Sequence, residues 1–156
     1  MDFIYQEPYP ILKDDTTYKK LTSDYVKVEQ LGDREILVVD PKGLELLAQE
    51  AMDDVSFMLR SAHLQKLRNI IEDPEATDND RFVAYNLLQN AAVAVEGQLP
   101  SCQDTGTAIV VAKKGENVYT GVEDGEWLSK GIFNTYQNKN LRYSQIVPIS
   151  MFEEKN

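Results

Sequence analysis

The sequence predicts an α+β fold in which three or four helices pack with short antiparallel strands, arranged as two hairpins, next to an extended N-terminal arm. Two patterns support this prediction. Apolar residues recur every three or four positions in several stretches between residues 40 and 136, which is typical of amphipathic helices. Short β-branched runs flank glycine-containing turns, which is typical of hairpins.

Composition and charge set the class of protein. The chain has 156 residues, of which 42% are hydrophobic and 27% charged, as in ordinary folded domains. Acidic residues outnumber Lys and Arg by 26 to 16, and the net charge of -10 repels nucleic acids and anionic membranes. No stretch approaches the roughly 20 apolar residues of a membrane span, and MDFIYQEPYP does not resemble a signal peptide. We therefore expect a cytoplasmic protein that binds neither nucleic acid nor membrane.

The N-terminal part predicts an arm followed by a hairpin. Residues 1–23 contain EPYP and the polar run KDDTTYKK, a composition that favours an extended arm over the surface of the domain. Residues 25–31 and 35–39 are β-rich runs separated by Gly32 and Asp33, a turn signal. The sequence therefore predicts a first hairpin directly after the arm.

Three consecutive helices are predicted next. The first helix is expected to begin at Asp40 and Pro41, because aspartate is favoured at the N-cap and proline at the first helical position. The second helix is expected to stop at Asp73, before a proline. Thr77 and Asp78 can cap the third helix, which is expected to end at Gly97. We expect the three helices to form a small bundle. The core face predicted for the first of them consists of Leu44, Leu47, Ala48, Ala51, Val55 and Leu59.

The C-terminal part predicts a second hairpin and a last helix. AIVVA at 108–112 and VYT at 118–120 flank KKGEN, a glycine-containing turn. Asp124 can cap a helix that continues through Tyr136. No internal repeat or low-complexity tract accompanies these elements.

Cys102 is the only cysteine and lies in a polar loop between the third helix and the second hairpin. It cannot form an internal disulfide, so it is a buried small residue, a reactive thiolate or a metal ligand. A nucleophile would need a base such as the single histidine, His63, with Asp104 orienting it, and nothing in the sequence places His63 near the loop. A metal or cluster would need further ligands from outside this chain.

The string LPSCQDTGTAIVVAKKGE resembles the first cluster-ligand segment of the iron-sulfur fumarate hydratases, the class I fumarases, and of the related tartrate dehydratases. The similarity extends to YQEPYPILKDDTTYKKLTSDYV, to VSFMLRSAH and to GIFNTYQNKNLRYSQ, so that it covers essentially the whole chain. The arm favours the single-chain fumarase form. In this family three cysteines hold a 4Fe-4S cluster that leaves one iron open to the substrate.

The resemblance implies roles for four residues. Cys102 matches the first cluster ligand, and the other two cysteines are absent from these 156 residues. Gln103 and Asp104 would reach the substrate, the amide at a carboxylate and the acid at the hydroxyl or water near iron. Arg142 matches an arginine that grips a substrate carboxylate, a task suited to the guanidinium fork. No role carries over to Arg60 or His63.

Members of this family are much longer than this chain. The resemblance therefore implies that residues 24–156 are part of the N-terminal, cluster-binding domain of a longer homodimeric enzyme acting on fumarate and malate. The isolated chain is then expected to be inactive and to hold no stable cluster. The general base would lie beyond residue 156. Two alternatives remain: a tartrate dehydratase or other hydroxy-diacid hydro-lyase, and a non-enzymatic binding domain in which Cys102 is merely packed.

Overall fold

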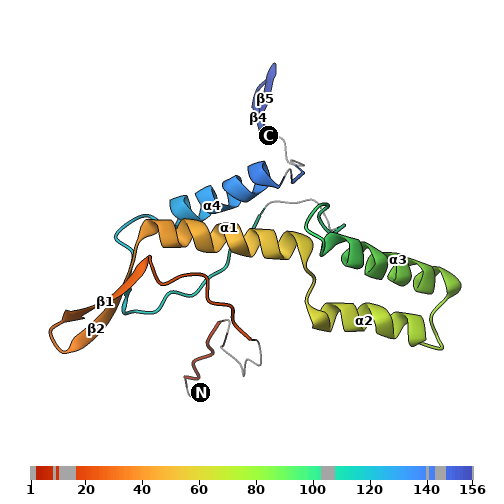
Figure 1. The fold of residues 1–156 in the computed structure, drawn as a ribbon, viewed down its shortest axis with the longest axis horizontal. Coiled ribbons are helices and arrows are strands. Elements are labelled where there is room, and N and C mark those ends of the chain that lie inside the picture. The colour runs from red at the N-terminus through yellow and green to blue at the C-terminus, as the bar shows by residue number, and fades with distance from the viewer. Residues whose placement is uncertain are drawn as a thin grey trace.

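A computed structural model describes residues 3–8, 10, 17–102, 108–139, 141–142 and 147–155 (Figure 1). The described ranges contain helices together with short strands, so the predicted α+β class is confirmed. In chain order the elements are β1 (Val26–Leu31), β2 (Arg34–Val39), α1 (Pro41–Phe57), α2 (Ser61–Glu72), α3 (Asp78–Ala94), β3 (Val118–Tyr119), α4 (Asp124–Asn138), β4 (Val147–Ser150) and β5 (Glu153–Lys155).

The helices form two pairs instead of the predicted three-helix bundle. Helix α1 packs along α4, while α2 packs against α3 beyond the C-terminal end of α1 (Figure 1). Gly131 of α4 is buried against α1, where a β-carbon would lie only 2.2 Å from the carbonyl oxygen of Glu45. The missing side chain lets the two backbones approach closely. The bundle prediction is therefore wrong, because the partner of α1 comes from a distant part of the sequence.

The core face of α1 also differs from the prediction. Ala48 is buried as expected, but Leu47 is 52% exposed and Val55 is 53% exposed. Helix α4 instead covers a neighbouring face through small and polar residues: the Thr135 hydroxyl donates to the Gln49 carbonyl at 2.8 Å. Part of the predicted apolar stripe consequently faces outward in this chain.

The predicted helix ends at Asp40, Asp73 and Thr77 are confirmed, whereas the predicted cap at Asp124 is wrong, because Glu123 is the N-cap of α4 and no side chain among the described residues caps this helix. The Asp40 carboxylate accepts a hydrogen bond from the Lys42 backbone N–H at 2.8 Å, with proline in the first turn. Thr77 and Asp80 form a reciprocal capping box at the start of α3. Helix α2 ends one residue before Asp73, as the following proline requires. Helix α3 ends at Ala94, three residues before Gly97, whose φ of +75° suits glycine.

The first hairpin is confirmed and the second is wrong. Strands β1 and β2 pair antiparallel around a turn in which Gly32 has a φ of +62°. Residues 108–117 contain no strand, and β3 pairs parallel with β2, with Leu37 opposite Val118. The Leu37 N–H donates to the Asn117 carbonyl at 2.8 Å, so the open edge of β2 takes the place of the expected partner. An unpredicted antiparallel pair, β4 and β5, follows α4.

The described residues of the arm, 3–8, 10 and 17–23, form neither helix nor strand. Phe3 is 90% exposed, so its ring does not pack on this chain. An ion pair between Glu7 and Lys113 joins the arm to the segment before β3. None of the helices in the described ranges has the length and apolar character that crossing a bilayer demands.

Candidate functional site

Cys102 lies just beyond the C-terminal end of α3 and is exposed. Its backbone N–H donates a hydrogen bond to the Asn90 side-chain oxygen, with a nitrogen-to-oxygen distance of 2.6 Å. Exposure contradicts the interpretation of Cys102 as a packed core residue, because its side chain is not covered by apolar neighbours in this chain. A thiol in this position is open to a ligand or a reactant.

Ser101, the residue before the cysteine, is buried and fixed to the end of α1. Its backbone N–H and its hydroxyl both donate to the carbonyl oxygen of Ser56, at 2.8 and 2.9 Å. Ser56 is in the last turn of α1, where carbonyl groups have no partner within the helix. Ser101 therefore satisfies an otherwise unpaired carbonyl and holds the chain that leads to Cys102 against α1.

Arg142 is exposed and follows the C-terminal end of α4. Leu141 beside it is buried, and its N–H donates to the Tyr136 carbonyl at 3.1 Å. At the end of α4, the Lys139 ammonium lies 3.2 Å from a carboxylate oxygen of Asp53 and 5.4 Å from the ring centre of Phe57. The segment that leads to Arg142 is therefore held at Lys139 against the last turns of α1.

The structure thus brings the chain segments of Cys102 and Arg142 to the same end of α1. One is fixed at Ser56 and the other at Asp53 and Phe57. The predicted substrate residues Gln103 and Asp104 lie outside the described residues.

The predicted alternative of a cysteine nucleophile gains no support. His63 is exposed in α2, and its backbone N–H donates to the Arg60 carbonyl at 2.9 Å. Arg60 is the residue at the N-terminal cap of the same helix. Neither residue has a hydrogen bond to the Cys102 segment among those found in the described residues.

The donor groups of the described residues suit one corner of a cluster site. Cys102 offers one exposed sulfur, a suitable ligand for iron once it is a thiolate. Within the described ranges, no three His, Cys, Asp or Glu side chains gather closely enough to hold a metal ion. A cluster would therefore bind to this part of the chain through a single ligand and take its others from elsewhere.

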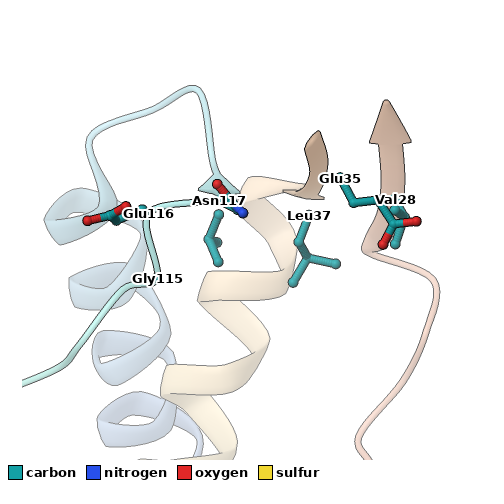
Figure 2. A pocket seen from close by; sticks show the side chains of 7 residues that line it. Val28, Glu35, Leu37, Gly115, Glu116 and Asn117 are labelled. Atoms are coloured by element: carbon teal, nitrogen blue, oxygen red, sulfur yellow. The ribbon is translucent and has the colours of Figure 1, made fainter. Parts of the chain in front are cut away.

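Two hollows of the described surface lie away from this end of α1. One of about 540 Å³ is formed beside the sheet, where Val28 and Leu37 face the loop that carries Glu116 and Asn117 (Figure 2). Another of about 400 Å³ lies among the first hairpin, the start of α1 and the start of α4. Both are at the N-terminal end of α1, whereas Cys102 and Arg142 follow segments fixed at its C-terminal end.

Electrostatic contacts also stabilise the N-terminal end of α4. Asp124 accepts hydrogen bonds from Lys114 and Thr120, which hold the pKa of its carboxyl below the usual value. Glu45 of α1 pairs with Lys130 and accepts from Asn134, and these contacts lower the pKa of Glu45. Both carboxylates fix α4 in place and lie away from the cysteine.

Sequence reasoning did not find Asn90 or Ser56. Asn90 acts through one hydrogen bond to a residue 12 positions away, and Ser56 through two hydrogen bonds to a residue 45 positions away. Neither belongs to a motif, and none of these hydrogen bonds follows a helical or strand repeat. No sequence pattern indicated them.

Comparison with known proteins identifies the family. Residues 45–156 match the family model described as fumarate hydratase (Fumerase). The chain belongs to the fumarate hydratase family. It is 54% identical over 154 residues to "Fumarate hydratase class I, anaerobic" of Escherichia coli K12, and 52% identical to the aerobic class I enzyme of the same strain. It is 51% identical over 144 residues to "Fumarate hydratase 1, mitochondrial" of Leishmania major.

The alignments cover nearly all of this chain but only a small part of each relative. The alignments include 99%, 99% and 91% of this chain, but only 28%, 28% and 26% of the three relatives. The chain thus spans about a quarter of the length of the fumarate hydratases that it matches. Most of a complete fumarate hydratase therefore has no counterpart in these 156 residues.

Proposed function

We propose that this chain belongs to the N-terminal, cluster-binding domain of a class I fumarate hydratase that reversibly adds water to fumarate to give L-malate. The main support is an identity of 51–54% with fumarate hydratases along nearly the whole chain. The exposed sulfur of Cys102, in the segment that resembles the family's first cluster-ligand segment, agrees with this assignment. The domain would comprise residues 24–156, with residues 1–23 as an extended arm.

The proposed cofactor is a 4Fe-4S cluster, which when bound supplies a Lewis acid that polarises the substrate oxygen. Cys102 would provide one thiolate ligand. Gln103 would donate its amide N–H to a substrate carboxylate, and Asp104 would bond the hydroxyl or water that is added or removed. The remaining ligands and the general base would belong to parts of the enzyme outside this chain.

Arg142 would bind one carboxylate of the substrate. Fumarate is a dianion, and this chain carries a net charge of -10. Because like charges repel, binding of fumarate needs a local cation. Arg142 is exposed, and its planar guanidinium can donate two parallel hydrogen bonds to a carboxylate.

The proposal also concerns the compartment, the oligomeric state and the binding partners of the full-length enzyme. The full-length enzyme would be a cytoplasmic homodimer that binds neither nucleic acid nor membrane, in keeping with the acidic composition. One relative carries the word mitochondrial in its name, so fractionation of the source cells is the test of compartment. The isolated chain would be inactive, since it contains one of three cluster ligands.

The first experiment replaces the proposed ligand. In the full-length enzyme purified without oxygen, Cys102→Ser should lose most of the bound iron and the hydration of fumarate, while the circular dichroism of the protein stays unchanged. Full iron content and rate in this variant would contradict the ligand assignment. Rates on malate and tartrate, measured side by side, decide between a fumarate hydratase and a tartrate dehydratase.

The second experiment tests the proposed carboxylate contact. Arg142→Lys keeps the charge but removes the paired hydrogen bonds, so KM for malate should rise by about tenfold or more, since hydrogen bonds to charged groups contribute about 1.5–3 kcal/mol. Arg68→Lys is the matched control, because Arg68 is exposed and pairs with Glu72 of its own helix. Equal KM values in the two variants would contradict the assignment of Arg142 to the substrate site.

A further inference from the structure

The side chain of Asn90 makes a contact that its own helix does not require. Asn90 lies near the C-terminal end of α3 and is half-buried. Its side-chain oxygen accepts the backbone N–H of Cys102 at 2.6 Å, a short distance for a hydrogen bond of this type. Leucine forms helices better than asparagine does. An amide at this position therefore has a cost in helix stability that the contact with Cys102 explains.

Two different helices thus hold the chain at the cysteine, because each accepts a hydrogen bond from one of two neighbouring N–H groups. The Ser101 N–H is held by the Ser56 carbonyl of α1, and the Cys102 N–H by Asn90 of α3. The thiol itself remains exposed. Restraining the backbone while leaving the sulfur open is the arrangement expected of a pre-organised ligand, because the ordering cost is met on folding and not on binding.

We propose that Asn90 is a positioning residue that orients Cys102 for cluster binding by accepting its backbone N–H. This inference rests on the proposed function. Asn90 acts through the backbone of Cys102 and not as a ligand. Residues that orient a metal ligand commonly alter metal retention by about 10–100-fold when they are replaced.

The test uses three variants of the full-length enzyme. Asn90→Leu removes the acceptor with little change of volume, and Asn90→Asp keeps an oxygen at the same place. Asn86→Leu is the matched control one turn earlier on α3, where the amide is exposed and donates to the Phe82 carbonyl of its own helix. Unchanged circular dichroism in all three variants identifies effects that are local to the site.

The first measurement is amide hydrogen exchange of the peptide that contains Cys102, in protein from which iron has been removed with a chelator. Asn90→Leu should speed exchange at Cys102 by about fivefold or more, as expected for the loss of one hydrogen bond. Asn90→Asp and Asn86→Leu should exchange like the wild type. Unchanged exchange in Asn90→Leu would overturn the inference.

The second measurement follows release of iron from the reconstituted, anaerobic enzyme after addition of a chelator. Asn90→Leu should lose iron about tenfold faster than the wild type, with Asp at this position restoring retention. Wild-type retention in Asn90→Leu would overturn the inference while leaving the proposed cluster intact. If the wild-type enzyme and Cys102→Ser hold equally little iron, the proposed function fails as well.

Discussion

Gly131 provides a sharp test of how α1 and α4 pack. A β-carbon at this position would lie 2.2 Å from the Glu45 carbonyl oxygen, 2.9 Å from the Ala48 β-carbon and 3.0 Å from the Gln49 nitrogen. Two of these three are backbone atoms of α1, so rotation of a side chain cannot relieve the overlap. The variant Gly131→Ala must therefore push the two helices apart.

The size of the effect follows from the contacts that separation would break. Moving the new β-carbon from 2.2 Å to the 3.4 Å of an ordinary contact requires the helices to part by about 1 Å. The hydrogen bonds from Asn134 to Glu45 and from Thr135 to Gln49, both 2.8 Å long, would then be lost. Each is worth about 1 kcal/mol, and overpacking costs about 1–3 kcal/mol, against a gain of about 1 kcal/mol in helix propensity. We expect a net destabilisation of about 2–4 kcal/mol.

Urea unfolding of the 156-residue chain, followed by circular dichroism, measures this loss. Gly125→Ala is the matched control in the first turn of the same helix, because its β-carbon would meet its nearest neighbour at an ordinary 3.5 Å. That variant should be neutral or more stable by about 0.5–1 kcal/mol. Equal stability of the two variants would show that α4 does not pack on α1 through Gly131.

Three further predictions concern single contacts. Thr77→Ala removes one half of the capping box of α3 and should lower the free energy of unfolding by about 1 kcal/mol, measured by urea titration against Thr22→Ala. Ser101→Ala removes the buried hydroxyl bond to Ser56 and should cost about 1 kcal/mol by the same assay, with an unchanged value arguing that the N–H bond alone suffices. The Asp124 carboxyl has a lowered pKa, so its contribution is present above the usual pKa of 3.8 and is lost as the pH falls through the lowered value. Asp124→Asn should therefore be less stable than the wild type at pH 7, and the difference should shrink in thermal melts below about pH 3.8; a difference independent of pH would contradict the pairing with Lys114.

Local chemistry made part of the fold predictable. The cap at Asp40, the capping residue Thr77 and the helix stop at Asp73 each depend on residues within four positions. The first hairpin follows from its glycine turn in the same way. Elements whose ends are set by near neighbours could therefore be read from the sequence alone.

Long-range packing could not be read in this way. The apolar repeat of α1 identified a helix, but its neighbour α4 is recognised through a glycine and polar side chains that no periodicity marks. Residues 108–112 are apolar and mostly β-branched, yet β3 pairs with β2 because that edge is available in the folded chain. In both cases the outcome depends on which surface is near, and local propensity does not contain that information.

Part of the candidate site could likewise be predicted from the sequence, and part could not. Cys102 stands out in the sequence because it is the single cysteine in a dense polar loop, whereas Asn90 and Ser56 become visible only through hydrogen bonds in the folded chain. The residues of the loop suggested a ligand site, and under the proposed function the supporting residues would determine how firmly the sulfur of Cys102 is held.

The outward-facing apolar residues bear on the size of the working enzyme. On α1, Leu47 and Val55 are more than half exposed, and Ile109 is 83% exposed in the segment after the cysteine loop. Exposed apolar side chains at several places on one chain are consistent with surfaces that the rest of a larger protein covers. Because the chain spans about 28% of its Escherichia coli relatives, we expect the remainder of the enzyme to cover these residues. Under the proposed function the same remainder would bring the missing cluster ligands to Cys102, so that burial of these residues and assembly of the cluster would be parts of one folding event.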